Sequence, residues 1–158
     1  MNNIVLCGFM GCGKSTVGKN IARKSGRKFL DMDSYIEEKA GMTVSEIFEK
    51  YGEEKFRDME HDACVELAGL EDLVIASGGG AFTFKRNVEA FKGKDKIVFL
   101  DVPLGIIKSR LKNDTTRPLL QRPDRDRVMK DLYDSRYPIY HAAVSYTHLR
   151  AHETKANL

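Results

Sequence analysis

Short apolar runs along this chain alternate with stretches in which apolar residues recur every three or four positions. The apolar runs cover residues 4–7, 28–31, 73–76 and 97–100, and their length predicts short buried strands. The stretches between them predict helices over 15–25, 34–40, 44–51, 53–68, 84–91, 104–111 and 128–137, the last ended by Pro138. Buried strands separated by helices indicate a parallel sheet covered on both faces. We therefore predict a single α/β domain over residues 1–158, a three-layer sandwich around a central parallel sheet of about five strands.

Two local patterns refine this picture. Thr43 and Glu46 have the spacing of a capping box, and an apolar stripe within 53–68 predicts a face turned to the core: Phe56, Met59, Ala63 and Leu67. Residues 113–126 are polar, contain Pro118 and Pro123 and show no apolar periodicity. We predict a mobile lid there.

The composition fits a compact enzyme and excludes some other classes. No apolar run approaches the ~20 residues needed to span a bilayer, so we expect no membrane partner. The net charge of +3 is mild and gives no reason to expect a nucleic-acid partner. Basic residues gather between 117 and 136, which indicates either a functional cluster or an ordinary solvated basic face. The three cysteines lack metal-site spacing, and free thiols predict a cytoplasmic location.

Residues 8–15 read GFMGCGKS and fit the phosphate-binding loop pattern G-x-x-x-x-G-K-[ST]. The segment lies between a predicted strand and a predicted helix, as such a loop must. Glycines allow the backbone N–H groups to turn toward one phosphate, and the following helix N-terminus favours an anion. The pattern predicts an ATP site formed by Gly11, Cys12, Gly13, Lys14, Ser15 and Thr16, in which the lysine reaches the phosphates and Ser15 is a ligand for Mg²⁺.

Other chemistry is expected where strands end, because open parallel sheets bind ligands at their carboxyl edge. Asp31 and Asp33 follow the second strand, where one can serve a metal and the other accept a proton; a helix N-cap at Asp33 is the alternative. The run 78–80 after the third strand consists of three glycines, which suits close approach of a small ligand, or a plain turn. Arg57 is either functional or a surface residue paired with Glu60.

These segments together resemble one family, the shikimate kinases. The resemblance covers residues 3 to about 143 and rests on ordered motifs: GFMGCGKST, FLDMDSYIE, Phe56-Arg57-x-x-Glu60, ASGGG, Arg117-Pro118-Leu119-Leu120 and Arg136-Tyr137-Pro138-x-Tyr140. It implies a P-loop fold like that of nucleoside monophosphate kinases, with a substrate-binding region at about 33–60 and the lid at about 113–126. It also implies phosphoryl transfer from ATP to the 3-hydroxyl of shikimate, giving shikimate 3-phosphate and ADP.

The resemblance assigns roles on the acceptor side of the site. Arg57 and Arg136 match the arginines that bind the shikimate carboxylate. Asp33 matches the carboxylate that holds the ring hydroxyls and accepts the proton of the attacking one. Gly79 and Gly80 are expected to close on the same ring through backbone groups.

On the nucleotide side, Lys14 and Arg117 are expected to neutralise the transferring phosphoryl group, with Arg117 carried on the lid. Ser15 and Asp31 are expected to hold Mg²⁺, and Arg110 matches a position that flanks adenine. The predicted catalytic set is Lys14, Asp33 and Arg117. We expect the protein to be a monomer.

The chain departs from the family's pattern after Ala143, where a further strand and a final helix are expected. Residues 144–158 instead read VSYTHLRAHETKANL, and we interpret them as non-native. Two other hypotheses stay open at this point. One is another small-molecule P-loop kinase, for gluconate or a nucleoside monophosphate; the other is a truncated chain that binds ligands and turns over poorly.

Overall fold

The central element is a parallel sheet with strand order β2-β3-β1-β4-β5 in a computed structural model that describes residues 2–112, 123–143 and 146–147. Its strands are β1 Ile4–Cys7, β2 Lys28–Asp31, β3 Leu73–Ala76, β4 Lys96–Phe99 and β5 Tyr146–Thr147. The predicted parallel α/β sheet is therefore confirmed, with four strands of four residues and the two-residue β5. The fourth strand lies one residue earlier than expected.

The strand β5 completes the predicted sheet of about five strands, and it lies within residues 144–158, where the chain departs from the family's pattern and shows no apolar run. The structure pairs it in parallel with the end of β4, Val98 with Tyr146 and Phe99 with Thr147. Such pairing uses backbone groups along the free edge of β4 and needs no side-chain pattern. It was therefore not visible as an apolar run.

The helices follow the predicted stretches closely at the start of the chain. They are α1 Lys14–Ser25, α2 Met32–Ala40, α3 Val44–Ala68, the 3₁₀ turn η1 Ala81–Thr83, α4 Lys85–Phe91, α5 Leu104–Leu111 and α6 Arg125–Ala143. The break predicted between 51 and 53 exists as a kink in α3, where Gly52 has φ 86° and ψ 173°. The predicted capping box of Thr43 and Glu46 is present at the start of α3. No described helix is long and apolar enough to cross a membrane.

Helix α6 is longer at both ends than expected. It begins at Arg125, inside the predicted lid, and the N–H of Val128 donates to the Asp124 carbonyl at 3.0 Å. It also continues through Pro138, which was expected to end it. Proline removes one helical hydrogen bond at a cost of roughly 3 kcal/mol, and the burial of Tyr140 beyond it favours continuation of the helix. The other predicted lid residues, 113–122, lie outside the described residues.

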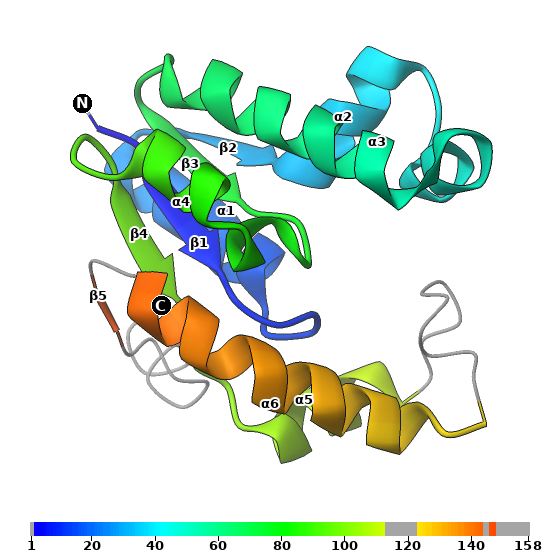
Figure 1. Cartoon of the computed structure of the whole chain (residues 1–158). Coiled ribbons are helices and arrows are strands. Elements are labelled where there is room, and N and C mark those ends of the chain that lie inside the picture. The colour runs from blue at the N-terminus through cyan, green and yellow to red at the C-terminus, as the bar shows by residue number, and fades with distance from the viewer. Residues whose placement is uncertain (1, 113–122, 144–145, 148–158) are drawn as a thin grey trace.

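Alternate strand residues supply two separate cores. One face of the sheet packs its side chains, such as Val5, Ile75 and Phe99, against α2, α3, η1 and α4. The opposite face, with Leu6 and Val74, packs against α1 and α5, and α6 contributes to both cores. The three cysteines, Cys7, Cys12 and Cys64, are free and buried in these layers. Figure 1 shows α2 and α3 on one side of the molecule and α5 and α6 on the other, with the sheet between them.

Candidate functional site

A cavity of about 350 Å³ opens at the carboxyl ends of β1, β2 and β3. Each of these strands supplies part of its wall, because the segment that follows each strand turns over the same edge of the sheet. The lining residues are Met10, Gly11, Cys12, Gly13, Lys14, Ser15, Thr16, Asp31, Asp33, Ser77 and Gly79. Three segments that are distant in sequence thus meet at one cavity.

The phosphate-binding loop connects β1 to α1 and forms the floor of this cavity. Gly13, with φ 93°, caps α1 in the left-handed region that favours glycine, and the Cys12 N–H donates to the Phe9 carbonyl at 3.1 Å. The Lys14 ammonium donates to the carbonyls of Gly8 at 2.7 Å and Phe9 at 3.3 Å. The loop therefore holds its lysine at the cavity wall, beside the exposed N-terminus of α1.

Arg110 reaches the same loop from α5. Its Nη1 donates to the Gly11 carbonyl at 3.1 Å, and the side chain is exposed at the rim. The adjoining Leu111 packs so tightly on Gly11 that a Cβ there would lie 3.0 Å from the leucine Cγ. Helix α5 thus fixes the outer side of the loop, where a nucleotide base would follow its phosphates.

The two aspartates after β2 have different functions in the fold. Asp31 is the N-cap of α2, because its Oδ1 accepts from the Ser34 N–H at 3.1 Å. The alternative that Asp33 caps this helix is therefore wrong, and Asp33 lies in the first turn of α2. Burial and, next, the Asp31 carboxylate raise the pKa of Asp33 above its ordinary value, while Lys14 opposes the rise.

Arg57 projects from α3 toward the glycine run and is held by acidic partners. Its Nη1 lies 3.1 Å from Glu60 Oε1 and its Nε lies 3.5 Å from Glu53 Oε1. The alternative of a surface ion pair is only half right, since the pair with Glu60 forms but the Arg57 side chain is 18% exposed and Glu60 only 1%. Burial raises the pKa of Glu60, and Arg57 opposes that rise. The structure thus fixes the arginine in a partly desolvated position.

The glycine run after β3 lies between α3 and α6. A Cβ at Gly78 would lie 2.5 Å from Asp33 Oδ1, and one at Gly80 would lie 2.9 Å from Arg57 Nη1. From the opposite side, Arg136 Nη1 donates to the Gly79 carbonyl at 2.9 Å. A side chain at Gly78 or Gly80 would have to displace Asp33 or Arg57, so the predicted bare backbone has a steric reason beyond a plain turn at these two positions.

Ser15, Asp31 and Ser77 present oxygen atoms to the cavity that suit a divalent cation and its waters. The Ser77 hydroxyl is buried and has no hydrogen-bond partner among the described residues. Those residues contain no cluster of three or more His, Cys, Asp or Glu side chains able to hold a metal alone. A few oxygen ligands fit Mg²⁺, which keeps several waters and is completed by substrate phosphates.

Of the residues predicted for the site, the phosphate-binding loop, Asp31, Asp33, Arg57, Gly79, Gly80, Arg110 and Arg136 lie around this cavity or against its walls. Arg117 lies outside the described residues. The structure adds Glu60, Ser77 and Tyr140, which lie within the quoted motifs but were not among the predicted site residues. For Glu60 a signal existed: it lies four residues after Phe56 and three before Ala63, on the stripe predicted to face the core.

A parallel sheet that places a phosphate-binding loop beside a carboxylate pair and a cation-compatible pocket is the arrangement of a P-loop phosphotransferase. The family model for shikimate kinase matches residues 10–158. The chain belongs to the shikimate kinase family.

Individual relatives agree with this placement. The chain is 44% identical over 143 residues to the shikimate kinase of Sulfurihydrogenibium sp. (strain YO3AOP1), covering 90% of this chain and 85% of that protein. It is also 44% identical over 138 residues to the shikimate kinase of Geobacter sulfurreducens, covering 87% and 76%. The solved structure of the Acinetobacter baumannii shikimate kinase in complex with shikimate is 42% identical, with a TM-score of 0.88 and coverage of 94% and 83%.

Proposed function

We propose that this chain transfers the γ-phosphoryl group of ATP to the 3-hydroxyl of shikimate, giving shikimate 3-phosphate and ADP. One observation carries the proposal: two guanidinium groups, Arg57 from α3 and Arg136 from α6, reach the same glycine run beside Asp33. Two arginines that converge beside one cavity suit a small acceptor with a carboxylate, because guanidinium groups pair with carboxylates in fixed fork geometry. Family membership supports the same acceptor, as does the likeness to the Acinetobacter baumannii enzyme, whose structure is a complex with shikimate.

On the acceptor side, we assign the carboxylate of shikimate to Arg57 and Arg136 and the ring hydroxyls to Asp33. An ionised Asp33 accepts the proton of the attacking hydroxyl as the new P–O bond forms. Its raised pKa makes it a better base than an ordinary aspartate, since proton affinity and basic strength rise together. Gly79 and Gly80 leave the space for the ring.

On the donor side, the N-terminus of α1 and Lys14 receive the β- and γ-phosphates. Ser15 and Asp31 would hold Mg²⁺, with the Ser77 hydroxyl placed to bond one of its waters. The ion supplies charge neutralisation on the phosphates when bound. Arg110 lies where the nucleotide leaves the loop, and a phosphate-neutralising role for Arg117 stays a prediction from the sequence. A monomeric state and a cytoplasmic location stay predictions too.

Gluconate and nucleoside monophosphates are the competing acceptors. Gluconate also carries a carboxylate, but it is an open chain that loses more conformational freedom on binding than a ring does. A nucleoside monophosphate needs a base pocket next to its phosphate. Both are less compatible with the two arginines and the glycine run than shikimate is.

Coupled ADP release tests the proposal directly. Purified chain is assayed with ATP and Mg²⁺ against shikimate, gluconate, AMP and GMP at equal concentrations. We expect turnover with shikimate alone. Turnover with another acceptor and none with shikimate would refute the assignment.

A second version of the protein, with residues 144–158 replaced by the corresponding segment of a relative, separates the choice of acceptor from the effect of these residues on turnover. If only that version turns over while both bind ATP and shikimate by calorimetry, the acceptor is assigned correctly. The present chain is then a ligand-binding form with poor catalysis. If neither version binds shikimate, the proposed function is wrong.

A further inference from the structure

The Gly79 carbonyl oxygen accepts two hydrogen bonds from one helix. Arg136 Nη1 donates to it at 2.9 Å and the Tyr140 phenol O–H donates at 2.7 Å. The two side chains are four residues apart on α6, so they leave the same face of the helix one turn apart. A backbone carbonyl has two lone pairs, and α6 occupies both.

This double contact sets the orientation of the Gly79–Gly80 peptide. The described residues contain no cis peptide bond, and in a trans peptide the carbonyl and the following N–H point in opposite directions. With the Gly79 carbonyl turned toward α6, the Gly80 N–H is turned away from α6. Arg57 lies against Gly80, within 2.9 Å of where its Cβ would be. The Gly79 carbonyl is thus fixed by α6, and the Gly80 N–H, on the opposite side of the peptide, lies on the side away from α6.

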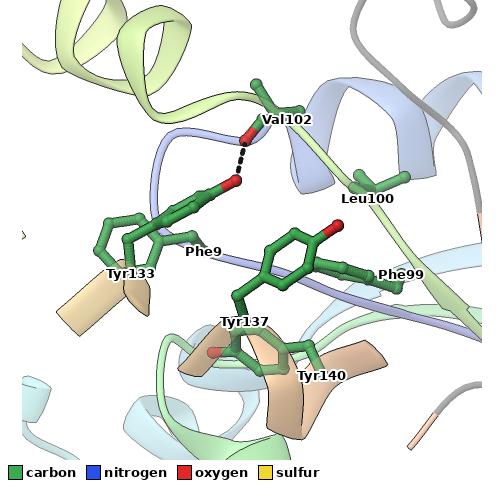
Figure 2. A pocket seen from close by; sticks show the side chains of 7 residues that line it. All are labelled: Phe9, Phe99, Leu100, Val102, Tyr133, Tyr137 and Tyr140. Carbon is green, nitrogen blue, oxygen red and sulfur yellow. Dashed lines mark hydrogen bonds between the residues drawn. The ribbon is translucent and has the colours of Figure 1, made fainter. Parts of the chain in front are cut away.

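Tyr140 is held more firmly than Arg136. The tyrosine is 1% exposed and its ring lies 5.6 Å from that of Phe99, whereas Arg136 is only half-buried. Figure 2 shows Tyr140 beneath Phe99 and Tyr137, with Tyr133 farther along the same helix. Burial raises the pKa of Tyr140 far above its ordinary value, so its hydroxyl keeps its proton and remains a donor at every physiological pH.

We propose that Tyr140 is a positioning residue for acceptor binding: through the shared Gly79 carbonyl it fixes both the glycine peptide and the Arg136 guanidinium that faces the acceptor. The inference rests on the proposed assignment of Arg136 and the glycine run to shikimate. Tyr140 fixes the carbonyl from the protein interior, and Arg136 then contacts an oxygen that is already in place. The remaining N–H groups of the guanidinium are left for an anion, since one of its five donors is used on the backbone.

The test compares Tyr140→Phe with Tyr133→Phe. The control is matched: Tyr133 also lies on α6, and its hydroxyl also donates to a backbone carbonyl, that of Val102 at 3.2 Å (Figure 2), rather than to the glycine run. We expect Tyr140→Phe to raise the KM and Kd for shikimate by about 5- to 20-fold, the usual effect of losing one buried hydrogen bond at a binding site. The KM for ATP should stay within about twofold, and Tyr133→Phe should leave shikimate binding unchanged.

A double variant with Arg136→Ala shows whether Tyr140 acts through Arg136. If it does, Tyr140→Phe should weaken shikimate binding much less in the Arg136→Ala background than in the unmodified chain, because neighbours that share a partner are not additive. Full additivity would overturn the proposed coupling. Equal effects of Tyr140→Phe and Tyr133→Phe would overturn it too. A Tyr140→Phe protein that unfolds below the assay temperature would mark a purely structural role and refute the proposal.

The same set of variants keeps two failures distinct. If Arg136→Ala itself leaves shikimate binding intact, the assignment of the acceptor site is wrong and the inference about Tyr140 falls with it. If Arg136→Ala weakens binding and Tyr140→Phe does not, the acceptor site stands and only the role of Tyr140 is refuted.

Discussion

Asp33 and Glu60 both approach the backbone of Gly78, the first glycine of the run, at 2.5 Å and 3.3 Å from where its Cβ would be. Burial is the main cause that raises the pKa of each carboxyl; Asp31 adds to the rise at Asp33, and Asp33 adds to the rise at Glu60. Lys14 and Arg57 counteract the rise for Asp33. A buried carboxylate with a raised pKa destabilises the fold when it is ionised, but it is a stronger base than an exposed one. Such perturbed groups are common at catalytic sites.

Replacing Asp33 with Asn should lower kcat by about 10²–10⁴-fold, the usual contribution of a general base, and leave the Kd for ATP within a fewfold. Steady-state assays and calorimetry measure the two quantities. Asp62→Asn, an exposed aspartate on α3, is the matched control and should retain activity. If ATP binding fails together with turnover in Asp33→Asn, Asp33 serves the metal or the fold and not the acceptor.

The same variant should gain stability at neutral pH. Because the folded-state pKa of Asp33 is raised, the folded chain binds a proton more tightly than the unfolded chain, and this contribution is lost as pH rises from 3.8 through the raised value. Above that window the ionised carboxylate destabilises the fold, and asparagine removes the penalty. Thermal melts should give Asp33→Asn the higher Tm at pH 7 and a difference that shrinks toward zero on acidification. A lower Tm at pH 7 would contradict the pKa argument.

Arg57→Ala and Arg136→Ala should each weaken shikimate binding by about 2–4 kcal/mol, through loss of a charge-assisted pair with its carboxylate. The methyl ester of shikimate is the control ligand, since it lacks the charge and should bind both variants and the unmodified chain alike. A penalty that persists in full on the ester would show that the arginines do not bind the carboxylate. Arg57→Ala also leaves buried Glu60 without its cation, so Arg57→Ala/Glu60→Gln should recover stability without recovering affinity.

At the scale of elements, close contacts between layers decide where the site segments lie. Helix α1 approaches β2 so closely that a Cβ on Gly18 would be 2.5 Å from the Phe29 ring. That approach brings the phosphate-binding loop, which precedes α1, beside the aspartates that follow β2. One glycine in the helix interior therefore contributes to the spacing of nucleotide and acceptor.

Gly18→Ala should destabilise the protein by about 1–3 kcal/mol, because the ring at Phe29 must shift to make room for the added methyl group. Gly105→Ala in α5 is the matched control: nothing lies within 4 Å of its Cβ position, so alanine should stabilise by about 0.5–1 kcal/mol. Urea unfolding of both variants measures the difference. A neutral Gly18→Ala would show that α1 can move away from β2 without cost.

Elements with a strong local signal could be predicted, and elements fixed by distant contacts could not. The strands β1, β2 and β3 and the break at Gly52 follow from apolar runs and glycine placement alone. Helix α6 passes Pro138 because Tyr140 is buried against Phe99 and bonded to Gly79, 61 residues away in sequence. The two-residue β5 forms by pairing with the free edge of β4, and no local sequence pattern predicts it.

At the scale of the whole molecule, the edge of the sheet opposite the site is closed by Asn3, which is fully buried. Its Oδ1 accepts from the Leu73 N–H at 3.0 Å, and its Nδ2 donates to the carbonyls of Leu67 and Leu70 at 3.4 Å and 3.0 Å. Its own N–H donates to Asp95 Oδ1 at 2.8 Å. One side chain thus joins the start of β1, the end of α3 and the start of β3.

Asn3→Ala should cost about 2–4 kcal/mol of stability, because it leaves buried backbone groups without partners. The kcat and KM of the folded protein should stay near their original values, since the change lies at the far edge of the sheet. Asn20→Ala is the control: its hydrogen bond with Arg23 is exposed and its loss should cost under about 0.5 kcal/mol. A large kinetic effect of Asn3→Ala at full folding would show coupling between the two edges.

The residues of the site could be predicted better than the contacts that hold them in place. The phosphate-binding loop is a contiguous motif, and the acceptor residues were found by resemblance and position at strand ends. The pair of Arg57 with Glu60 is one of the two alternatives that the sequence offers, and it forms. The structure adds two contacts that differ from the prediction or go beyond it: Asp31 rather than Asp33 caps α2, and Tyr140 holds the glycine run. The Tyr140–Gly79 hydrogen bond joins residues 61 apart in sequence, so it depends on packing between layers and cannot be predicted from local spacing.

The three buried cysteines allow local opening of the fold to be measured by thiol labelling. Burial raises the pKa of Cys7 and of Cys64 to about 12, so each thiol reacts with a labelling reagent only after its surroundings open to solvent. Cys7 lies on the central strand, Cys12 in the phosphate-binding loop and Cys64 in α3. Their labelling rates would therefore rank the sheet, the loop and the helical layer by the free energy of opening, without any cysteine being introduced.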